Sequence, residues 1–249
     1  MSTLSANTLF HFTRNKENLI SILESNFRPC YCSEKNYLVR SETWKVPIVC
    51  FCDIPLSQVE EHTSWYGEYA IGMTKEWAIK NNVNPVMYIN KEVKLINTIK
   101  SNFDFLIKQK SCNTTANNDI QSIINNILYQ YAYIKPYQGM QFDKKQGANI
   151  NKRYYNEREW RYVAINKDKS LFEFATAFFS GQREALNDSI KEYGLNFEPK
   201  DINYIIVSKE NEILEIKRKV EDIKGNFSRD DVELLTTRII SMERIREDF

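Results

Sequence analysis

Residues 47–56 read Pro-Ile-Val-Cys-Phe-Cys-Asp-Ile-Pro-Leu, and residues 62–73 read His-Thr-Ser-Trp-Tyr-Gly-Glu-Tyr-Ala-Ile-Gly-Met. Each segment contains a short apolar run, which predicts strands over residues 48–52 and 70–73. An aspartate and a proline end the first run, and the polar piece between the runs carries His62, one of two histidines in the chain. Two strands that converge on a histidine, an aspartate and several tyrosines are expected to form the wall of a site.

Outside these segments, extended and helical patterns alternate along the chain. Short apolar or aromatic runs predict further strands over residues 9–13, 85–89, 134–139, 154–165, 202–208 and 234–240, with 30–39 irregular or extended and 140–151 a polar loop. Helical spacing predicts helices from a cap at Thr13 or Asn15 to residue 25, and over 75–81, 93–110, 117–133 and 210–224. The sequence therefore predicts one α+β domain over residues 1–249, with a helical insertion at 93–133.

Composition excludes several functional classes. The chain has 249 residues, 34 basic and 33 acidic side chains and a formal net charge of +1, so it has no overall electrostatic preference for nucleic acid or membranes. Its seven glycines form no phosphate-binding glycine-rich loop and no hydrolase elbow. The N-terminus does not resemble a secretory signal, and no apolar run is long enough to span a bilayer. We therefore expect a cytoplasmic protein with no membrane association and with reduced cysteines.

The two histidines are candidates for a binding role. His11 lies between two phenylalanines on the predicted first strand, so its side chain and that of Thr13 should point to the same face. A polar face at a strand end, directly before a helix N-terminus, suits a ribose or a phosphate. The alternative is a histidine that only ties its strand to a loop. His62, near Tyr66 and Tyr69, could help to stack a base or a nicotinamide ring, or could belong to the core.

Residues 154–163, Tyr-Tyr-Asn-Glu-Arg-Glu-Trp-Arg-Tyr-Val, provide candidate catalytic carboxylates. If this segment is a strand, two sets of side chains occupy its two faces: Glu157, Glu159 and Arg161, and Arg158, Trp160 and Tyr162. A carboxylate there could stabilise an oxocarbenium-like centre or orient a hydroxyl group. The alternative is a solvated sheet face with an internal ion pair.

Four cysteines form two Cys-x-Cys pairs, Cys30 with Cys32 and Cys50 with Cys52. Four thiolates could build a structural zinc site, but such sites usually use Cys-x-x-Cys spacing. Cysteines that alternate along a strand often pack as small apolar groups. We therefore expect packing rather than a metal site.

Several motifs together resemble known families. The strand His11-Phe-Thr, followed by Glu17-Asn-Leu-Ile-Ser-Ile-Leu23, resembles the opening of DarT-like and other ADP-ribosyltransferase-like proteins. Four segments together resemble the AbiGi family of abortive-infection phage-resistance proteins, and they are residues 47–56, 62–67, 71–77 and 157–161. The resemblances imply an ADP-ribosyltransferase-like split β-sheet core with a helical insertion. AbiGi proteins are commonly described as antitoxins, which implies a nucleotidyltransferase-like toxin as partner.

The DarT-like resemblance also implies a chemistry, which is cleavage of the nicotinamide–ribose bond of NAD and transfer of ADP-ribose to a protein or nucleic-acid acceptor. Carried over by position, His11 would hold NAD with support from Thr13. Tyr66 or Tyr69 would stack on the nicotinamide. Arg40 is the best-placed candidate for the arginine that DarT-like enzymes use, and the R-S-E pattern of other transferases is not clearly present.

The same resemblance implies a late glutamate that stabilises the developing ribosyl cation. By position this catalytic carboxylate would be Glu159, or else Glu157, and His11 and Glu159 would then line one cleft. Three functions remain open: an NAD-using enzyme of phage defence, a non-enzymatic antitoxin of the same fold that binds a partner toxin, and a nucleotide- or nucleic-acid-binding module. The last predicts a local basic stripe, formed by Lys144, Lys145, Lys152, Arg153 and Arg158.

Overall fold

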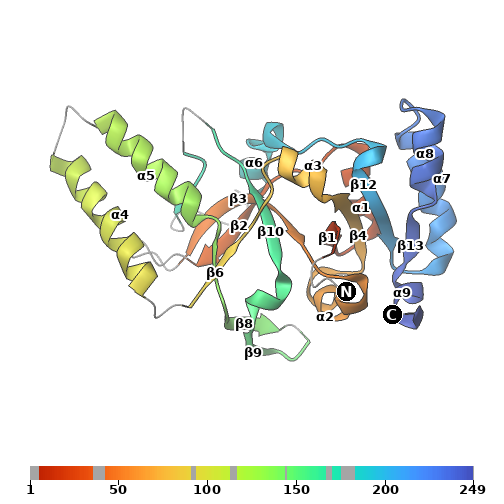
Figure 1. Cartoon of the computed structure of the whole chain (residues 1–249), viewed down its shortest axis with the longest axis horizontal. Helices are drawn as coiled ribbons and strands as arrows, with labels where there is room; N and C mark the ends of the chain where they lie inside the picture. Colours follow the sequence, from red (N-terminus) through yellow and green to blue (C-terminus); the bar gives the residue numbers. More distant parts are fainter. Residues whose placement is uncertain are drawn as a thin grey trace.

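The structure is a computed structural model that describes residues 6–35, 43–90, 94–112, 117–143, 145–166, 170–174 and 183–248. Within these residues the chain forms a mixed α+β fold around a nine-stranded sheet (Figure 1). The main path of the sheet runs β13-β12-β4-β1-β3-β10-β5, and β2 and β11 add to β3. None of the described helices is long and apolar enough to cross a membrane.

The strands of this sheet are β1 (Thr8–Thr13), β2 (Cys30–Lys35), β3 (Thr43–Cys52), β4 (Tyr69–Thr74), β5 (Asn84–Pro85), β10 (Glu159–Val163), β11 (Glu173–Phe174), β12 (Ile202–Val207) and β13 (Ile239–Ser241). Two smaller sheets are a parallel pair of β6 (Met87–Ile89) with β7 (Ile134–Pro136) and a hairpin of β8 (Gly139–Asp143) with β9 (Ala148–Lys152). The helices are α1 (Lys16–Glu24), α2 (Glu60–Tyr66), α3 (Lys75–Lys80), α4 (Lys94–Cys112), α5 (Asn117–Tyr131), α6 (Arg183–Asp188), α7 (Ile213–Ile223), α8 (Arg229–Thr236) and α9 (Met242–Asp248).

The arrangement of the sheet depends on β3. β10 and β11 pair with one edge of this strand, at residues 48–52 and 44–45. The other edge is shared, because β2 pairs with residues 43–48 whereas β1 meets β3 only at Cys52. Residues 49–51 therefore have no strand partner on that edge within the described part of the chain. The sheet is split there, between β1 and β2.

Apolar layers cover both faces of the sheet. In β1, Leu9 belongs to a core shared with α1, α3 and α7, whereas Phe10 and Phe12 belong to a core shared with α9, as the alternation of a strand requires. A third core fixes α4 and α5 against Trp44 and Val46 in the first half of β3. In Figure 1 the α4–α5 pair lies at one end of the molecule, and α7 and α8 lie at the other.

Much of the element order expected from the sequence is confirmed. The strands around residues 9–13, 48–52 and 70–73 are present, and so are the two long helices of the insertion. The mixed α+β class is confirmed as well. Asn15 caps α1, since its side-chain oxygen accepts a hydrogen bond from the Asn18 amide at 2.9 Å.

Two predictions in the third quarter of the chain are wrong. The strand expected over 154–165 begins only at Glu159, because residues 154–157 form a 3₁₀ turn and Arg158 adopts a left-handed conformation with φ of 43°. The loop expected over 140–151 contains the β8–β9 hairpin. The hairpin sequence is rich in Asn, Gln and Lys, which are poor strand formers, so local propensity gave no signal for it.

The strand expected over 234–240 is also wrong for most of its length. The Ser228 side chain accepts a hydrogen bond from the Asp231 amide and starts α8, which buries Val232 and Leu235. Only residues 239–241 form a strand, β13, which runs parallel to β12.

Gly67 ends α2 with φ of 107°, directly beside the end of β1. A Cβ there would lie 2.3 Å from the Thr13 carbonyl oxygen and 2.5 Å from the Arg14 Cα, and neither backbone atom can move aside cheaply. We therefore expect Gly67→Ala to lower the free energy of unfolding by roughly 2 to 4 kcal/mol in urea denaturation. The control is Gly147→Ala, because Gly147 has φ of 63° but nothing within 4 Å of an added Cβ. The control should lose only about 1 to 2 kcal/mol, and equal losses would contradict the steric argument.

Candidate functional site

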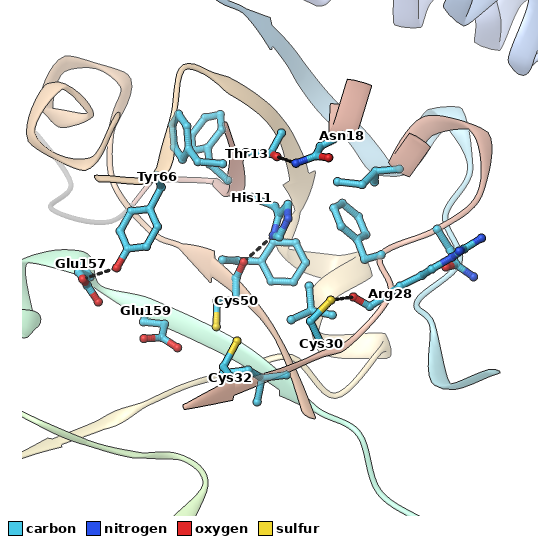
Figure 2. Close-up of a pocket in the computed structure, with 18 of the residues that line it drawn as sticks. His11, Thr13, Asn18, Arg28, Cys30, Cys32, Cys50, Tyr66, Glu157 and Glu159 are labelled. Carbon is cyan, nitrogen blue, oxygen red and sulfur yellow. Dashed lines mark hydrogen bonds between the residues drawn. The ribbon is translucent and has the colours of Figure 1, made fainter. Parts of the chain in front are cut away.

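A cavity of about 540 Å³ lies where the sheet splits, within the size range of small-molecule sites. Its walls come from β1, α1, β2, β3, α2, β7 and the start of β10, so they combine distant parts of the chain. Figure 2 shows His11 near the centre, with Tyr66, Glu157 and Glu159 on one side and Arg28 on the other. His11 and Glu159 both line this cavity, as the hypothesis of an NAD-using enzyme requires.

His11 is held by the gap in the sheet. Its Nδ1 lies 2.8 Å from the Cys50 carbonyl oxygen, which has no strand partner on that edge among the described residues. Because a carbonyl only accepts, Nδ1 carries the proton of this hydrogen bond. Burial lowers the pKa of His11, and the bond to Cys50 offsets this only in part, so the imidazole is neutral at pH 7. Its Nε2 is then an acceptor available to a ligand.

The same histidine ties β1 to β3, so the structural alternative and the binding role are compatible. Its ring packs against Phe27 and Phe51, with ring centroids 5.3 and 5.6 Å away. Thr13 also lines the cavity, and its hydroxyl oxygen accepts a hydrogen bond from Asn18 Nδ2 at 3.0 Å. Neighbouring groups therefore fix both polar side chains of β1 that line the cavity.

Glu157 lies at the end of the 3₁₀ turn and is buried. The Tyr66 hydroxyl donates a hydrogen bond to its Oε1 at 2.6 Å, and Lys152 Nζ is 2.6 Å from the same oxygen. Lys135 Nζ forms an ion pair with the other oxygen, Oε2. Both carboxylate oxygens of Glu157 therefore have partners.

Glu159 begins β10 and is buried beside Arg161, whose Nε and Nη2 lie 2.7 and 2.6 Å from Glu159 Oε1. Lys135 Nζ is 2.5 Å from Glu159 Oε2, so one ammonium group bridges the two glutamates. The Arg161 Nη1 group donates to the Ala132 carbonyl oxygen at 2.6 Å, just beyond the end of α5. The alternative of a solvated sheet face is wrong about solvent, since Glu157, Glu159 and Arg161 are all buried. The internal ion pair that it included is present between Glu159 and Arg161.

The face expected to carry three ionic side chains also needs correction. Only Glu159 and Arg161 alternate with Trp160 and Tyr162 along β10, whereas Glu157 precedes the strand. The left-handed Arg158 between the two glutamates turns the chain, so that both carboxylates still reach Lys135.

The cations keep both carboxylates ionised. Burial alone would raise the pKa of Glu159, but Arg161 and Lys135 lower it to about 2. Burial would also raise the pKa of Glu157, and Lys135 and Lys152 bring it below its ordinary value. For Lys135 the opposition of burial is outweighed by Glu159 and Glu157, which raise its pKa well above the ordinary value.

The three candidates His62, Tyr66 and Tyr69 differ in position, and so does Arg40. Tyr66 and His62 line the cavity, with their ring centroids 4.5 Å apart, and burial lowers the pKa of His62 to about 4. Tyr69 does not line the cavity, and its hydroxyl instead donates a hydrogen bond to Glu212 Oε1 at 2.9 Å. Arg40 lies outside the described residues. The structure therefore brings Tyr66, but not Tyr69, to the candidate site.

Cys32, Cys50 and Cys52 behave as packed thiols, whereas Cys30 is exposed. Cys30, Cys32 and Cys50 line the cavity, and Cys52 is buried in the core beneath β1. Burial raises the pKa of Cys32 to about 12 and that of Cys50 well above its ordinary value, so both stay protonated. Within the described ranges, no group of His, Cys, Asp and Glu side chains is arranged to hold a metal ion.

Comparison with known proteins gives the family. Residues 25–208 match the family model described as "Putative abortive phage resistance protein AbiGi, antitoxin". The chain belongs to the AbiGi family. An abortive phage resistance protein AbiGi from Lactococcus lactis subsp. cremoris is 27% identical over 230 residues, which are 83% of this chain and 90% of the relative. No solved structure matches, and neither match bears on the DarT-like resemblance.

The region that matches the AbiGi model contains the ionic cluster, defined as Glu34, Lys135, Lys152, Glu157, Glu159 and Arg161, but it begins after His11. Sequence reasoning had not found the roles of Lys135 and Lys152. Lys135 is an isolated basic residue in a short strand, and its partners lie 22 and 24 residues away. No local pattern signals such a contact.

Acid should destabilise this AbiGi-family protein in two steps. A folded-state pKa below the unfolded value means that the unfolded chain binds more protons, so stability falls as pH falls. His62 gives a window from pH 6.5 down to about 4, and Glu159 gives one from 4.5 down to about 2. In urea denaturation at constant ionic strength, His62→Gln should reduce the loss of stability in the upper window, to which His11 also contributes. Glu159→Gln should reduce the loss in the lower window, to which Glu157 also contributes. A stability that does not change between pH 7 and 4 would contradict this assignment.

Removal of the bridging cation should be costly. Lys135→Met leaves two buried carboxylates side by side without their shared ammonium, so we expect a loss of about 3 to 5 kcal/mol in the free energy of unfolding. The matched control is Lys217→Met, which removes an exposed pair with Glu221 at 2.7 Å and should cost less than about 1 kcal/mol. Similar losses in urea denaturation would show that the bridge contributes no more than a surface pair.

Proposed function

We propose that this protein binds NAD in the cavity and transfers ADP-ribose to a macromolecule as part of phage defence. The observation that supports this most strongly is that His11 of β1 and Glu159 of β10 line one cavity at the split of the sheet. The residues present suit the ligand. His11 offers a neutral acceptor for a ribose hydroxyl, Tyr66 offers an aromatic face, and Glu159 offers a fixed negative charge.

The low pKa of Glu159 limits the role that it can have. A carboxylate with a pKa of about 2 is a weak base at neutral pH, so it is poorly suited to remove a proton. It remains charged throughout the physiological range and can stabilise positive charge that develops on a ribose. In the proposed reaction the bond from C1′ to the nicotinamide nitrogen breaks with its electron pair on nicotinamide, and the acceptor bonds to C1′ and loses its proton to water.

A second candidate function is an antitoxin that binds a partner toxin, and the family description favours it because it names an antitoxin. The α4–α5 pair also exposes apolar side chains that a partner protein could cover, namely Leu95, Phe105, Ile107 and Ile123. A protein that acts only by binding has no need of a cavity with converging ionised and hydrogen-bonding groups. We therefore rank the enzyme first.

The third candidate, a nucleic-acid-binding module, is weakened by the positions of its expected basic residues. Lys152 is buried and paired with Glu157, and its Nζ lies 4.2 Å from the centre of the Trp65 ring. Lys144 lies outside the described residues. A continuous stripe through these positions therefore lacks Lys152.

The enzyme hypothesis predicts transfer of label from NAD. The wild-type protein, incubated with NAD labelled in its adenylate phosphate and with host-cell extract, should label a protein or nucleic acid. Glu159→Gln should reduce the rate by about 10²- to 10³-fold, because the neutral amide no longer stabilises a cation. Glu221→Gln, at an exposed pair outside the cavity lining, is the matched control and should keep full activity.

Two outcomes would count against this proposal. Equal labelling by wild type and Glu159→Gln would remove Glu159 from the chemistry. A complete absence of label on protein, DNA and RNA with the folded wild-type protein would favour the antitoxin.

A further inference from the structure

The segment 26–28 forms the wall of the cavity opposite the two glutamates. Figure 2 shows Arg28 on the opposite side of the cavity from Glu157 and Glu159. The backbone of Phe27 pairs with that of Leu195 through two hydrogen bonds, of 3.1 and 2.9 Å. This bridge fixes the segment, so that Asn26 and Arg28 reach the cavity from either side of Phe27.

Asn26 presents an acceptor without a partner. Its amide packs against Gly194, where an added Cβ would lie 2.5 Å from Asn26 Oδ1, so only glycine leaves room for the side chain. Asn26 Nδ2 donates to Asn196 Oδ1 at 3.1 Å. Asn26 Oδ1 is buried and accepts no hydrogen bond from any described group. A buried acceptor of this kind is costly unless a donor satisfies it.

Arg28 presents a charge without a counter-ion. The other charged residues that line the cavity all belong to the ionic cluster, where Glu34, Lys135, Glu157 and Glu159 have partners of opposite charge. Arg28 is exposed and forms no ion pair with a described residue. This end of the cavity therefore carries an uncompensated positive charge, which attracts anions.

Short polar side chains connect the two ends of the cavity. Asn18, Ser21 and Ser25 of α1 and its cap are spaced three and four residues apart, so they lie along one face of the helix, and all three line the cavity. They offer hydrogen-bonding groups along the path from His11 to Arg28. An elongated ligand rich in hydroxyl groups fits such a lining better than a compact apolar ligand.

We propose that Asn26 and Arg28 form a subsite for the phosphate-bearing half of a nucleotide ligand. Arg28 pairs with a phosphate. Rotation of the Asn26 amide away from Gly194 lets its unpartnered Oδ1 accept a hydrogen bond from a ribose hydroxyl or an exocyclic amine. The inference rests on the proposed function, because it assigns the other end of the same ligand. The subsite makes the cavity selective for phosphorylated over unphosphorylated nucleosides.

Calorimetry with ADP-ribose and with nicotinamide riboside tests this subsite, because only the first ligand carries phosphate. The wild-type protein should bind ADP-ribose. The affinity should be lower at about 0.3 M than at about 0.05 M salt, because salt screens the attraction between Arg28 and the phosphates. Arg28→Gln should weaken the binding of ADP-ribose at least about tenfold and leave the binding of nicotinamide riboside unchanged. Arg28→Lys should keep part of the affinity for ADP-ribose. Asn26→Leu should also weaken the binding of ADP-ribose. Arg218→Gln, an exposed arginine of α7 outside the cavity lining, is the matched control.

The outcomes separate this inference from the transferase. Unchanged ADP-ribose affinity in Arg28→Gln would overturn the subsite and leave the transferase standing. Binding of ADP-ribose that depends on Arg28, without transfer of label from NAD, would support the subsite and overturn the transferase. Failure of the wild-type protein to bind ADP-ribose would overturn the subsite. Because Arg28 is exposed, its variants should fold even if Asn26→Leu does not.

Discussion

The site depends on one edge of β3, where β1 and β2 both pair but leave a gap between them. β2 occupies the first half of this edge of β3 and β1 meets only its end, so the backbone of residues 49–51 faces the cavity without a strand partner there among the described residues. A buried carbonyl needs a donor. His11 supplies it to Cys50, which orients the imidazole and fixes the position of its proton. The gap that creates the cavity therefore also positions the first polar group inside it.

The ionic cluster meets a second constraint, which is the cost of burying charge. A buried carboxylate is tolerated only where cations and donors satisfy it. Glu157 and Glu159 share Lys135, and each has at least one further partner, Tyr66 and Lys152 for the first and Arg161 for the second. These partners come from α2, β7, β9 and β10. The cluster therefore links the helical insertion and the β8–β9 hairpin to the split sheet.

Periodicity and resemblance could predict part of this arrangement from the sequence. Alternation along β1 placed His11 opposite Phe10, and the resemblance placed Glu159 in the same cleft as His11. Neither could predict Lys135, because its contacts depend on how the chain returns from α5 to the sheet. Alternation failed at Glu157, because a left-handed residue, Arg158, interrupts the strand pattern there. Long-range charge pairing and single backbone reversals leave no periodic signal.

The balance of charge in the cluster bears on any chemistry in the cavity. The carboxylate of Glu159 remains ionised, but Arg161 and Lys135 lie beside it and reduce its field at a nearby ribose. A reaction that develops positive charge gains most from Glu159 when Lys135 turns away from it. The Lys135 ammonium also lies 5.2 Å from the centre of the Tyr154 ring, whose face can hold a cation that leaves a carboxylate. The contribution of Glu159 to the proposed transfer therefore depends on how closely the Lys135 ammonium stays beside its carboxylate.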